Sequence, residues 1–278
     1  MLTDLPLIVK ILYAILAGVY GYCLIVASDQ DFKHRALTVK MAWAFIIITT
    51  ISYVLRGYWF ALAAYWVFFL WSYFLYEVRP VQIAGGLVFV SVAIASLAMG
   101  WFPMEQAVQI AIMGFLWSLA FSMPRRGESD FNILYTNMAF FGVEGYMVFI
   151  IVLTVLYFLM LGAKIISRFQ NKTKNFLYLV YAFYFELTDP TAKNTPMAMR
   201  IQELYPDAPL DAQGETPIPL IPLMMVATML TSIIYGAIAN AWMLWIPGVL
   251  SLVGLVVAVL VLRNKNINRR KEAEVNVS

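Results

Sequence analysis

The sequence predicts an all-α protein, namely a polytopic transmembrane helical bundle of about eight spans with one long cytoplasmic amphipathic loop. Of its 278 residues, 62% are hydrophobic and only 13% are charged, whereas an ordinary soluble domain carries about 25% charged residues. Several runs of about 20 mostly apolar residues are long enough to cross a hydrocarbon layer about 30 Å thick. These runs lack the regular apolar and polar alternation of barrel strands. The chain is therefore expected to lie in lipid as helices.

The first apolar run, "MLTDLPLIVKILYAILAGVYGYCLIVAS", is interpreted as a transmembrane helix and not as a cleaved signal. No basic region precedes the run, and no obvious small-residue cleavage site ends it. Polar clusters and prolines separate the later runs. The eight predicted spans are residues 6–27, 38–55, 58–77, 81–101, 104–123, 133–163, 217–239 and 242–262. A seven-span alternative, in which residues 104–123 re-enter without crossing, stays open.

These spans divide the chain into four parts. They are a membrane bundle of six spans (1–163), a cytoplasmic or interfacial amphipathic segment (164–216), a transmembrane hairpin (217–262) and a basic cytoplasmic tail (263–278). Within the second part, Phe176 to Leu187 is too short to span lipid and too apolar for water. It predicts a helix lying in the membrane interface, or else a docking surface for a partner protein. Its amphipathic anchors would be Tyr178, Tyr181, Tyr184 and Phe185.

The distribution of Lys and Arg predicts the orientation, because positively charged loops tend to stay in the cytoplasm. With eight spans and the N-terminus inside, most basic residues are cytoplasmic, including those of the tail "RNKNINRRK". The chain is therefore expected to be an integral protein of the plasma or inner membrane with both termini cytoplasmic. The seven-span alternative would place the N-terminus outside and residues 28–40 inside.

Glu144, in "FFGVEGYMVF", is the carboxylate that most needs an explanation. A continuous helix over 131–163 would be about 50 Å long, which exceeds the hydrocarbon thickness. Glu144 then lies either near mid-membrane, where it must pair, protonate or line a wet cavity, or near the extracytoplasmic surface. The excess length favours the surface position, for which Glu144→Gln would be nearly neutral. Asn137, two turns earlier on the same face, and Asn240 are the other candidate polar intramembrane residues.

Small residues recur at four-residue spacing, which lets helix backbones pack closely in lipid. This pattern predicts helix contacts at Ala14, Gly18, Gly21, Ser91, Ala95, Thr228, Ser232 and Gly236. The stripe from Thr228 to Asn240 could instead line a polar path.

Arg56 and Arg79 lie at predicted helix ends, where long basic side chains extend to the headgroups. They are interpreted as interfacial anchors. The third span is dense in aromatic residues, which could form a wall for a flat apolar ligand. We favour the interpretation that these rings face lipid and neighbouring helices.

Several function classes are excluded by what the sequence lacks. His34 is the only histidine and Cys23 the only cysteine, which removes bis-histidine haem, histidine-rich metal centres and an intrachain disulfide. No Walker loop, G-x-S-x-G, H-E-x-x-H or G-x-G-x-x-G motif is present. No catalytic set, metal site, cofactor or nucleic-acid partner is predicted.

The leading functional prediction is a non-catalytic membrane subunit or scaffold of a larger membrane-embedded assembly for secretion, transfer or envelope biogenesis. Its partners would be the lipid bilayer together with other membrane subunits or further copies of the chain. A channel or transporter for a small solute or ion is the alternative, in which Glu144, Asn137 and the Thr228 to Asn240 stripe contribute a path. A membrane-lipid enzyme ranks third, because no nucleophile or metal set is recognisable.

Overall fold

The computed structural model describes residues 5–34, 37–75, 78–122, 128–169 and 220–257, and the regular structure in these ranges is helical. The predicted all-α fold is therefore confirmed. The predicted interfacial helix with Tyr178, Tyr181, Tyr184 and Phe185, and the tail 263–278, lie outside the described residues.

Seven of the eight predicted spans each correspond to one helix, and the span 133–163 falls within α6, which is broken at Gly142. The helices are α1 (Leu7–His34), α2 (Val39–Arg56), α3 (Trp59–Leu75), α4 (Arg79–Met99), α5 (Met104–Ser122), α6 (Glu128–Phe169), α9 (Leu220–Ile238) and a final described helix, Trp242–Val257. Gly57 and Gly100 end α2 and α4 in the left-handed conformation that glycine adopts most readily.

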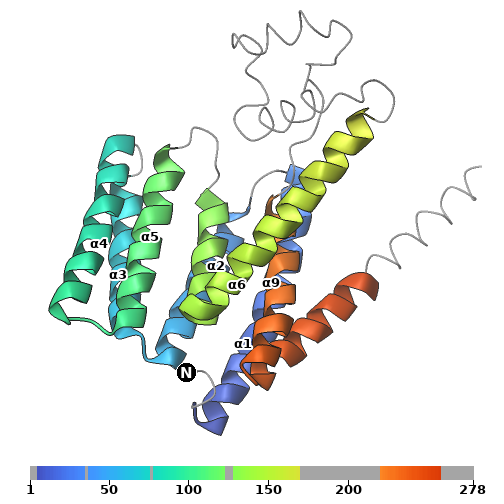
Figure 1. Ribbon diagram of the computed structural model, residues 1–278, viewed down its shortest axis with the longest axis horizontal. Helices are drawn as coiled ribbons and strands as arrows, with labels where there is room; N and C mark the ends of the chain where they lie inside the picture. Colours follow the sequence, from blue (N-terminus) through green and yellow to red (C-terminus); the bar gives the residue numbers. More distant parts are fainter. Residues whose placement is uncertain (1–4, 35–36, 76–77, 123–127, 170–219, 258–278) are drawn as a thin grey trace, which may run out of the picture. The chain divides into compact units, whose positions relative to one another are not determined.

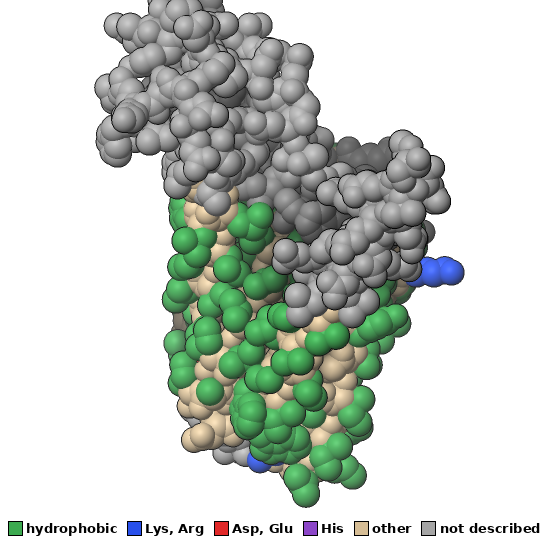
Figure 2. Space-filling model, turned by 90° about the vertical axis from the view of Figure 1, so that its right-hand side faces the viewer, with side chains coloured by type: hydrophobic (Ala, Val, Ile, Leu, Met, Phe, Trp, Pro, Cys, Tyr) green, Lys and Arg blue, Asp and Glu red, His purple; other side chains and the backbone are tan. Residues whose placement is uncertain are grey.

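Five helices are long and apolar enough to cross a membrane: Leu7–Asp31, Val39–Arg56, Pro80–Met99, Phe131–Gly162 and Leu220–Ile238. Trp59–Trp71 and Trp242–Val257 are shorter apolar helices. Figure 2 shows one face of the molecule, on which hydrophobic side chains cover most of the described surface. Together, these helices and this surface indicate an integral membrane protein in contact with the lipid bilayer.

Two compact units divide the chain, Met1–Val152 with Leu220–Ser278, and Leu153–Pro219. In the first unit, neighbouring helices pack in an antiparallel order, with α1 against α2, α2 against α3, α3 against α4 and α4 against α5. The helix α9 returns to pack against α1. In Figure 1, α3, α4 and α5 form one group, and α1 and α9 form another.

The helix α6 is not continuous, which corrects the expectation of a single helix about 50 Å long. Gly142 has φ 71° and ψ −176°, a conformation that is essentially restricted to glycine. The chain reverses there, since the phenol of Tyr146 after the break lies near that of Tyr135 before it. Figure 1 shows the first segment (128–141) and the second segment (from 143) meeting at this point. An apolar run that looks like one membrane span in the sequence thus forms two helical segments.

Glycines allow other helices to approach closely. A Cβ added to Gly114 of α5 would lie 2.5 Å from the backbone oxygen of Gly86 in α4. A Cβ on Gly236 of α9 would lie 2.8 Å from the backbone nitrogen of Trp245. A Cβ on Gly21 would lie 2.6 Å from Ser251 Oγ, where α1 contacts the final described helix. Backbone contact of this kind is possible only without a side chain.

Candidate functional site

The reversal of α6 brings several helix ends together. The C-terminus of α2 contributes Arg56, the turn before α3 contributes Tyr58, and the first turn of α5 contributes Glu105. We call this group, with Gly142 and Glu144, the reversal site.

Arg56 is at the centre of the reversal site. Its guanidinium donates hydrogen bonds to Glu105 Oε1 at 2.9 Å and to the Tyr58 hydroxyl oxygen at 2.9 Å. It also lies over the Tyr58 ring, 4.6 Å from the centroid. The Arg56 side chain is only 7% exposed, whereas that of Glu105 is 41% exposed. Arg56 ends α2 as expected for an anchor, but its charge is paired inside the protein.

The break in α6 leaves the carbonyl of Phe140 without a partner within the first segment, because the last carbonyls of a helix have none. Arg56 Nη1 donates to this carbonyl at 3.3 Å, and the Tyr13 hydroxyl donates to it as well. A guanidinium is also favourable at the negative end of a helix. Arg56 and Tyr13 therefore stabilise the reversal directly.

Gly142 provides the room for this arrangement. A Cβ at this position would lie 2.7 Å from Arg56 Nη1 and 2.7 Å from Glu105 Oε1. The absence of a side chain is thus needed twice, once for the backbone conformation and once for the ion pair.

Glu144 lies in the first turn of the second segment of α6 and is exposed. Its Oε2 accepts a hydrogen bond from the Tyr235 hydroxyl of α9 at 3.3 Å. Glu105 occupies the equivalent position in α5. Carboxylates are favourable at the positive N-terminal end of a helix. The reversal site therefore combines two carboxylates with one guanidinium.

Tyr58 links the two sides of the ion pair. Burial raises the pKa of its phenol above the usual range, so the hydroxyl keeps its proton and donates a hydrogen bond to Glu105 Oε2. This bond holds the Glu105 carboxylate in position against Arg56.

Asn137 and Asn240 lie in different surroundings. The Asn137 side chain is buried, and its Oδ1 accepts a hydrogen bond from Thr228 Oγ1 at 3.0 Å. Asn240 is exposed in the turn after α9 with φ 51°, a left-handed conformation that asparagine tolerates. The Thr228 to Asn240 stripe is therefore split between a buried contact and a surface turn.

The other predicted packing residues also divide into two groups. Thr228, Ser232 and Gly236 are buried, and Gly248 of the final described helix packs closely against Ser232. Gly18 is exposed, with nothing within 4 Å of an added Cβ. Ser91 is exposed, and its hydroxyl donates a hydrogen bond to the Leu87 carbonyl of the same helix. Ala14 and Ala95 are half-buried. Arg79, predicted as an interfacial anchor, begins α4.

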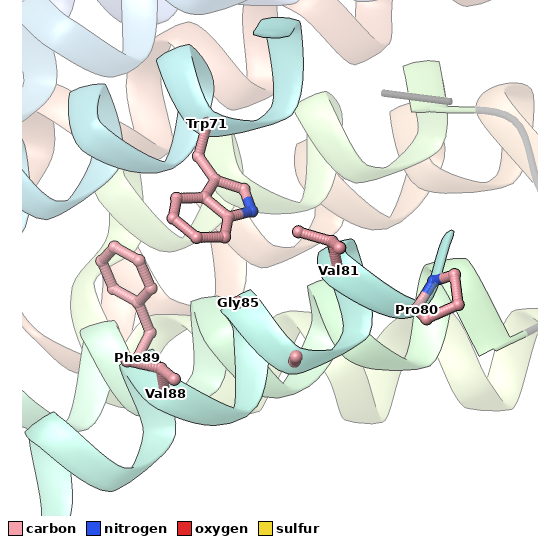
Figure 3. Close-up of a pocket in the computed structure, with 7 residues that line it drawn as sticks. Trp71, Pro80, Val81, Gly85, Val88 and Phe89 are labelled. Carbon is pink, nitrogen blue, oxygen red and sulfur yellow. The ribbon is translucent and has the colours of Figure 1, made fainter. Parts of the chain in front are cut away.

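A shallow cavity of about 330 Å³ lies between α3 and α4 (Figure 3). Trp71 of α3 covers Gly85 of α4, and Val81, Val88 and Phe89 complete the wall. Its lining is almost wholly apolar, so it offers a surface for hydrocarbon.

The sequence analysis did not identify Tyr13, Tyr58 or Glu105 as members of the site. A usable signal was present for Glu105, which is the sole acid between residues 104 and 123. Tyr13 and Tyr58 carry no such signal, because aromatic residues are frequent throughout the predicted spans.

Among the described residues, no group of three His, Cys, Asp or Glu side chains could hold a metal ion. The fold and its apolar helices define the protein as a helical membrane protein. No protein-family model, curated protein or solved structure matches the chain.

Proposed function

We propose that the protein is a channel or transporter for a small solute or ion, and that the reversal site is where the permeant species is handled. The observation that supports this function best is the break of α6 at Gly142, inside an apolar candidate span and surrounded by ionisable side chains. Discontinuous helices form the binding sites of many transporters, because their exposed ends present backbone charges. Ionisable residues near such a break are functional candidates by default.

The charges of the reversal site favour a cation. The site holds one guanidinium and two carboxylates, and the guanidinium is already bonded to Glu105 and to the Phe140 carbonyl. Glu144 is exposed and is contacted by a neutral phenol. We therefore propose a small cation, the proton included, as the permeant species, with Glu144 as the group that binds it.

A membrane subunit or scaffold of a plasma-membrane or inner-membrane assembly is the second candidate. The observation that favours it is the exposed position of Gly18 in α1, where no described residue lies within 4 Å of an added Cβ. Small residues on such a face suit close contact with a helix of another subunit or a second copy.

Reconstitution into proteoliposomes tests the transport proposal. Proton, Na⁺ and K⁺ fluxes would be measured with imposed gradients and ion-sensitive dyes. We expect flux of at least one cation, reduced at least tenfold by Glu144→Gln. This expectation differs from the near-neutral effect of a surface glutamate, because Glu144 belongs to the charged group at the break.

Asp29→Asn is the matched control. It also removes an exposed carboxylate, but Asp29 lies near the C-terminal end of α1, away from the reversal site. It should leave the flux unchanged. Absence of flux for all three cations, together with stoichiometric co-purification of other membrane proteins, would instead support the subunit function.

A further inference from the structure

The core of the first unit contains polar atoms that no described protein group satisfies. Among them are the hydroxyls of Tyr20, Tyr53 and Tyr146 and the Nδ2 of Asn137; Gln109 and Thr231 contribute the others. Each of these atoms is inaccessible, and none is part of the reversal site. We call the side chains of Tyr20, Tyr53, Tyr146 and Asn137 the core polar cluster.

These side chains come from different helices and converge. The phenol of Tyr20 in α1 lies beside Thr228 of α9, whose Oγ1 bonds Asn137 Oδ1. The phenol of Tyr146, in the second segment of α6, lies near those of Tyr20 and of Tyr53 in α2. The reversal of α6 is what places Asn137 and Tyr146 on either side of the same region.

An occupant of this region must accept hydrogen bonds. Phenol hydroxyls and the amide NH₂ group are all donors, and the large majority of buried polar side-chain atoms in native structures have a partner. No charged side chain belongs to the cluster, and the nearby Arg56 is paired with Glu105. Burying an anion there would therefore carry a large desolvation cost. Water is uncharged and can both accept and donate hydrogen bonds.

We propose that the core polar cluster is a binding site for ordered water molecules, which bridge Tyr20, Tyr53, Tyr146 and Asn137. Buried waters of this kind make about three hydrogen bonds each and are costly to remove. The site is an internal hydration site between α1, α2, α9 and the two segments of α6. The inference does not depend on the transport function, because it follows from unsatisfied donors alone.

The sign of a stability change tests the proposal. Tyr20→Phe, Tyr53→Phe and Tyr146→Phe would each be made in the full chain, and Tm would be measured in detergent. If water bridges the hydroxyls, each variant loses hydrogen bonds and its Tm falls. If the core is dry, each variant removes an unsatisfied group, and its Tm rises or stays unchanged.

Two further variants calibrate this measurement. Tyr135→Phe should lower Tm in either case, because its hydroxyl donates to the Met113 carbonyl at 3.2 Å. Tyr22→Phe should leave Tm unchanged, because Tyr22 is 68% exposed.

Radiolytic labelling in ¹⁸O-enriched water provides a direct readout. Bound water generates hydroxyl radicals beside the side chains that it contacts. Tyr20, Tyr53 and Tyr146 should therefore be modified despite their burial. Tyr13, which is equally buried but donates to the Phe140 carbonyl, should not be modified. Labelling of the three tyrosines no stronger than that of Tyr13, or an unchanged or raised Tm of the Phe variants, would overturn the proposal.

Discussion

At the scale of single residues, Gly142 determines both a backbone conformation and a site. Its φ of 71° with ψ near 180° is accessible to glycine at little cost, and its missing side chain leaves space for the pair of Arg56 with Glu105. Tyr13 and Arg56 then satisfy the carbonyl that the reversal releases. The unusual backbone and the polar contacts depend on one another.

Gly142→Ala should therefore destabilise the protein. The backbone conformation alone costs about 1–3 kcal/mol for a residue with a side chain, and the added methyl group would press on Arg56 and Glu105. We expect Tm to fall by roughly 5 °C or more, measured by intrinsic fluorescence in detergent.

Gly18→Ala is the control for this change. It adds the same methyl group at an exposed helical position with nothing within 4 Å. Alanine also has a higher helix propensity than glycine, so Tm should be unchanged or slightly raised. An equal loss of stability in both variants would refute the special role of Gly142.

At the scale of helices, the pair of α4 and α5 packs through backbone contact. Gly86 and Gly114 face one another so closely that each would place an added Cβ 2.5 Å from the other's backbone oxygen. Around this contact, Trp117 Nε1 donates to Gln82 Oε1 at 3.2 Å and Ser118 Oγ donates to the Ile83 carbonyl at 3.0 Å. In lipid, where apolar burial adds little, such contacts hold helices together.

Gly114→Ala should separate α4 from α5. Because the obstructing atoms belong to the backbone, no side-chain rearrangement can relieve the overlap, and we expect a cost of about 1–3 kcal/mol. Limited proteolysis or thermal unfolding in detergent can detect it. Gly254→Ala, with nothing within 4 Å of the added Cβ, should show no loss.

The helices could be predicted from the sequence, but the reversal could not. Each apolar run bounded by polar residues or proline, except the one broken at Gly142, is matched by one helix, since lipid requires every backbone group to be satisfied within its segment. Residues on both sides of Gly142 are equally apolar, so the hydropathy profile of the sequence indicates a single span. The reversal depends on contacts of Phe140 with Arg56 and Tyr13, which are 84 and 127 residues distant in sequence.

The reversal site was only partly predictable for the same reason. Glu144 and Arg56 stand out as charges beside apolar runs, and the sequence identifies both. Their assignment to one site depends on the turn at Gly142, which brings the start of the second α6 segment to the end of α2. No spacing within the sequence encodes this proximity.

At the scale of the whole molecule, the direction of the helices in the first unit bears on membrane orientation. The described residues form nine helical segments when α6 is divided at Gly142. Tyr13 near Phe140 and Ser28 near Met225 fix the direction of α1. The turns at 57–58, 100–103, 142 and 239–241 lie at one end, the reversal end. The C-termini of α1, α3 and α5 and the N-termini of α2, α4 and α6 lie at the other end.

Basic residues differ sharply between these two ends. At the helix ends opposite the reversal end lie Lys33, Lys40 and Arg79, and in sequence Arg35, Arg125 and Arg126 fall between the helices that meet there, whereas the turns at the reversal end contain no Lys or Arg and Lys10 lies near the start of α1 at that end. Arg56, beside one of them, is neutralised by Glu105. By the positive-inside rule, we propose that the end opposite the reversal end faces the cytoplasm.

The proposed orientation differs from the prediction that both termini are cytoplasmic, because it would place the start of α1 on the extracytoplasmic side. Cysteine labelling in a Cys23→Ser background tests it. An impermeant maleimide applied to intact cells should label Trp101→Cys and Asn240→Cys, and should not label Val39→Cys. All three positions are exposed. The opposite labelling pattern would restore the arrangement with both termini inside.

The turn at Gly142 consequently bears on whether the number of membrane crossings is odd or even. A straight α6 would give eight crossings, an even number, and would leave the basic connections divided between the two sides of the membrane. If both segments of α6 cross the bilayer, the additional crossing would make the number odd, and the helices after residue 142 would enter the bilayer in the sense that gathers positive charge on one side. Straightening α6 would require either the helices before Gly142 or those after it to insert with the opposite orientation across the membrane. Insertion by the translocation machinery, and not only the stability of the finished fold, is thus expected to depend on this glycine.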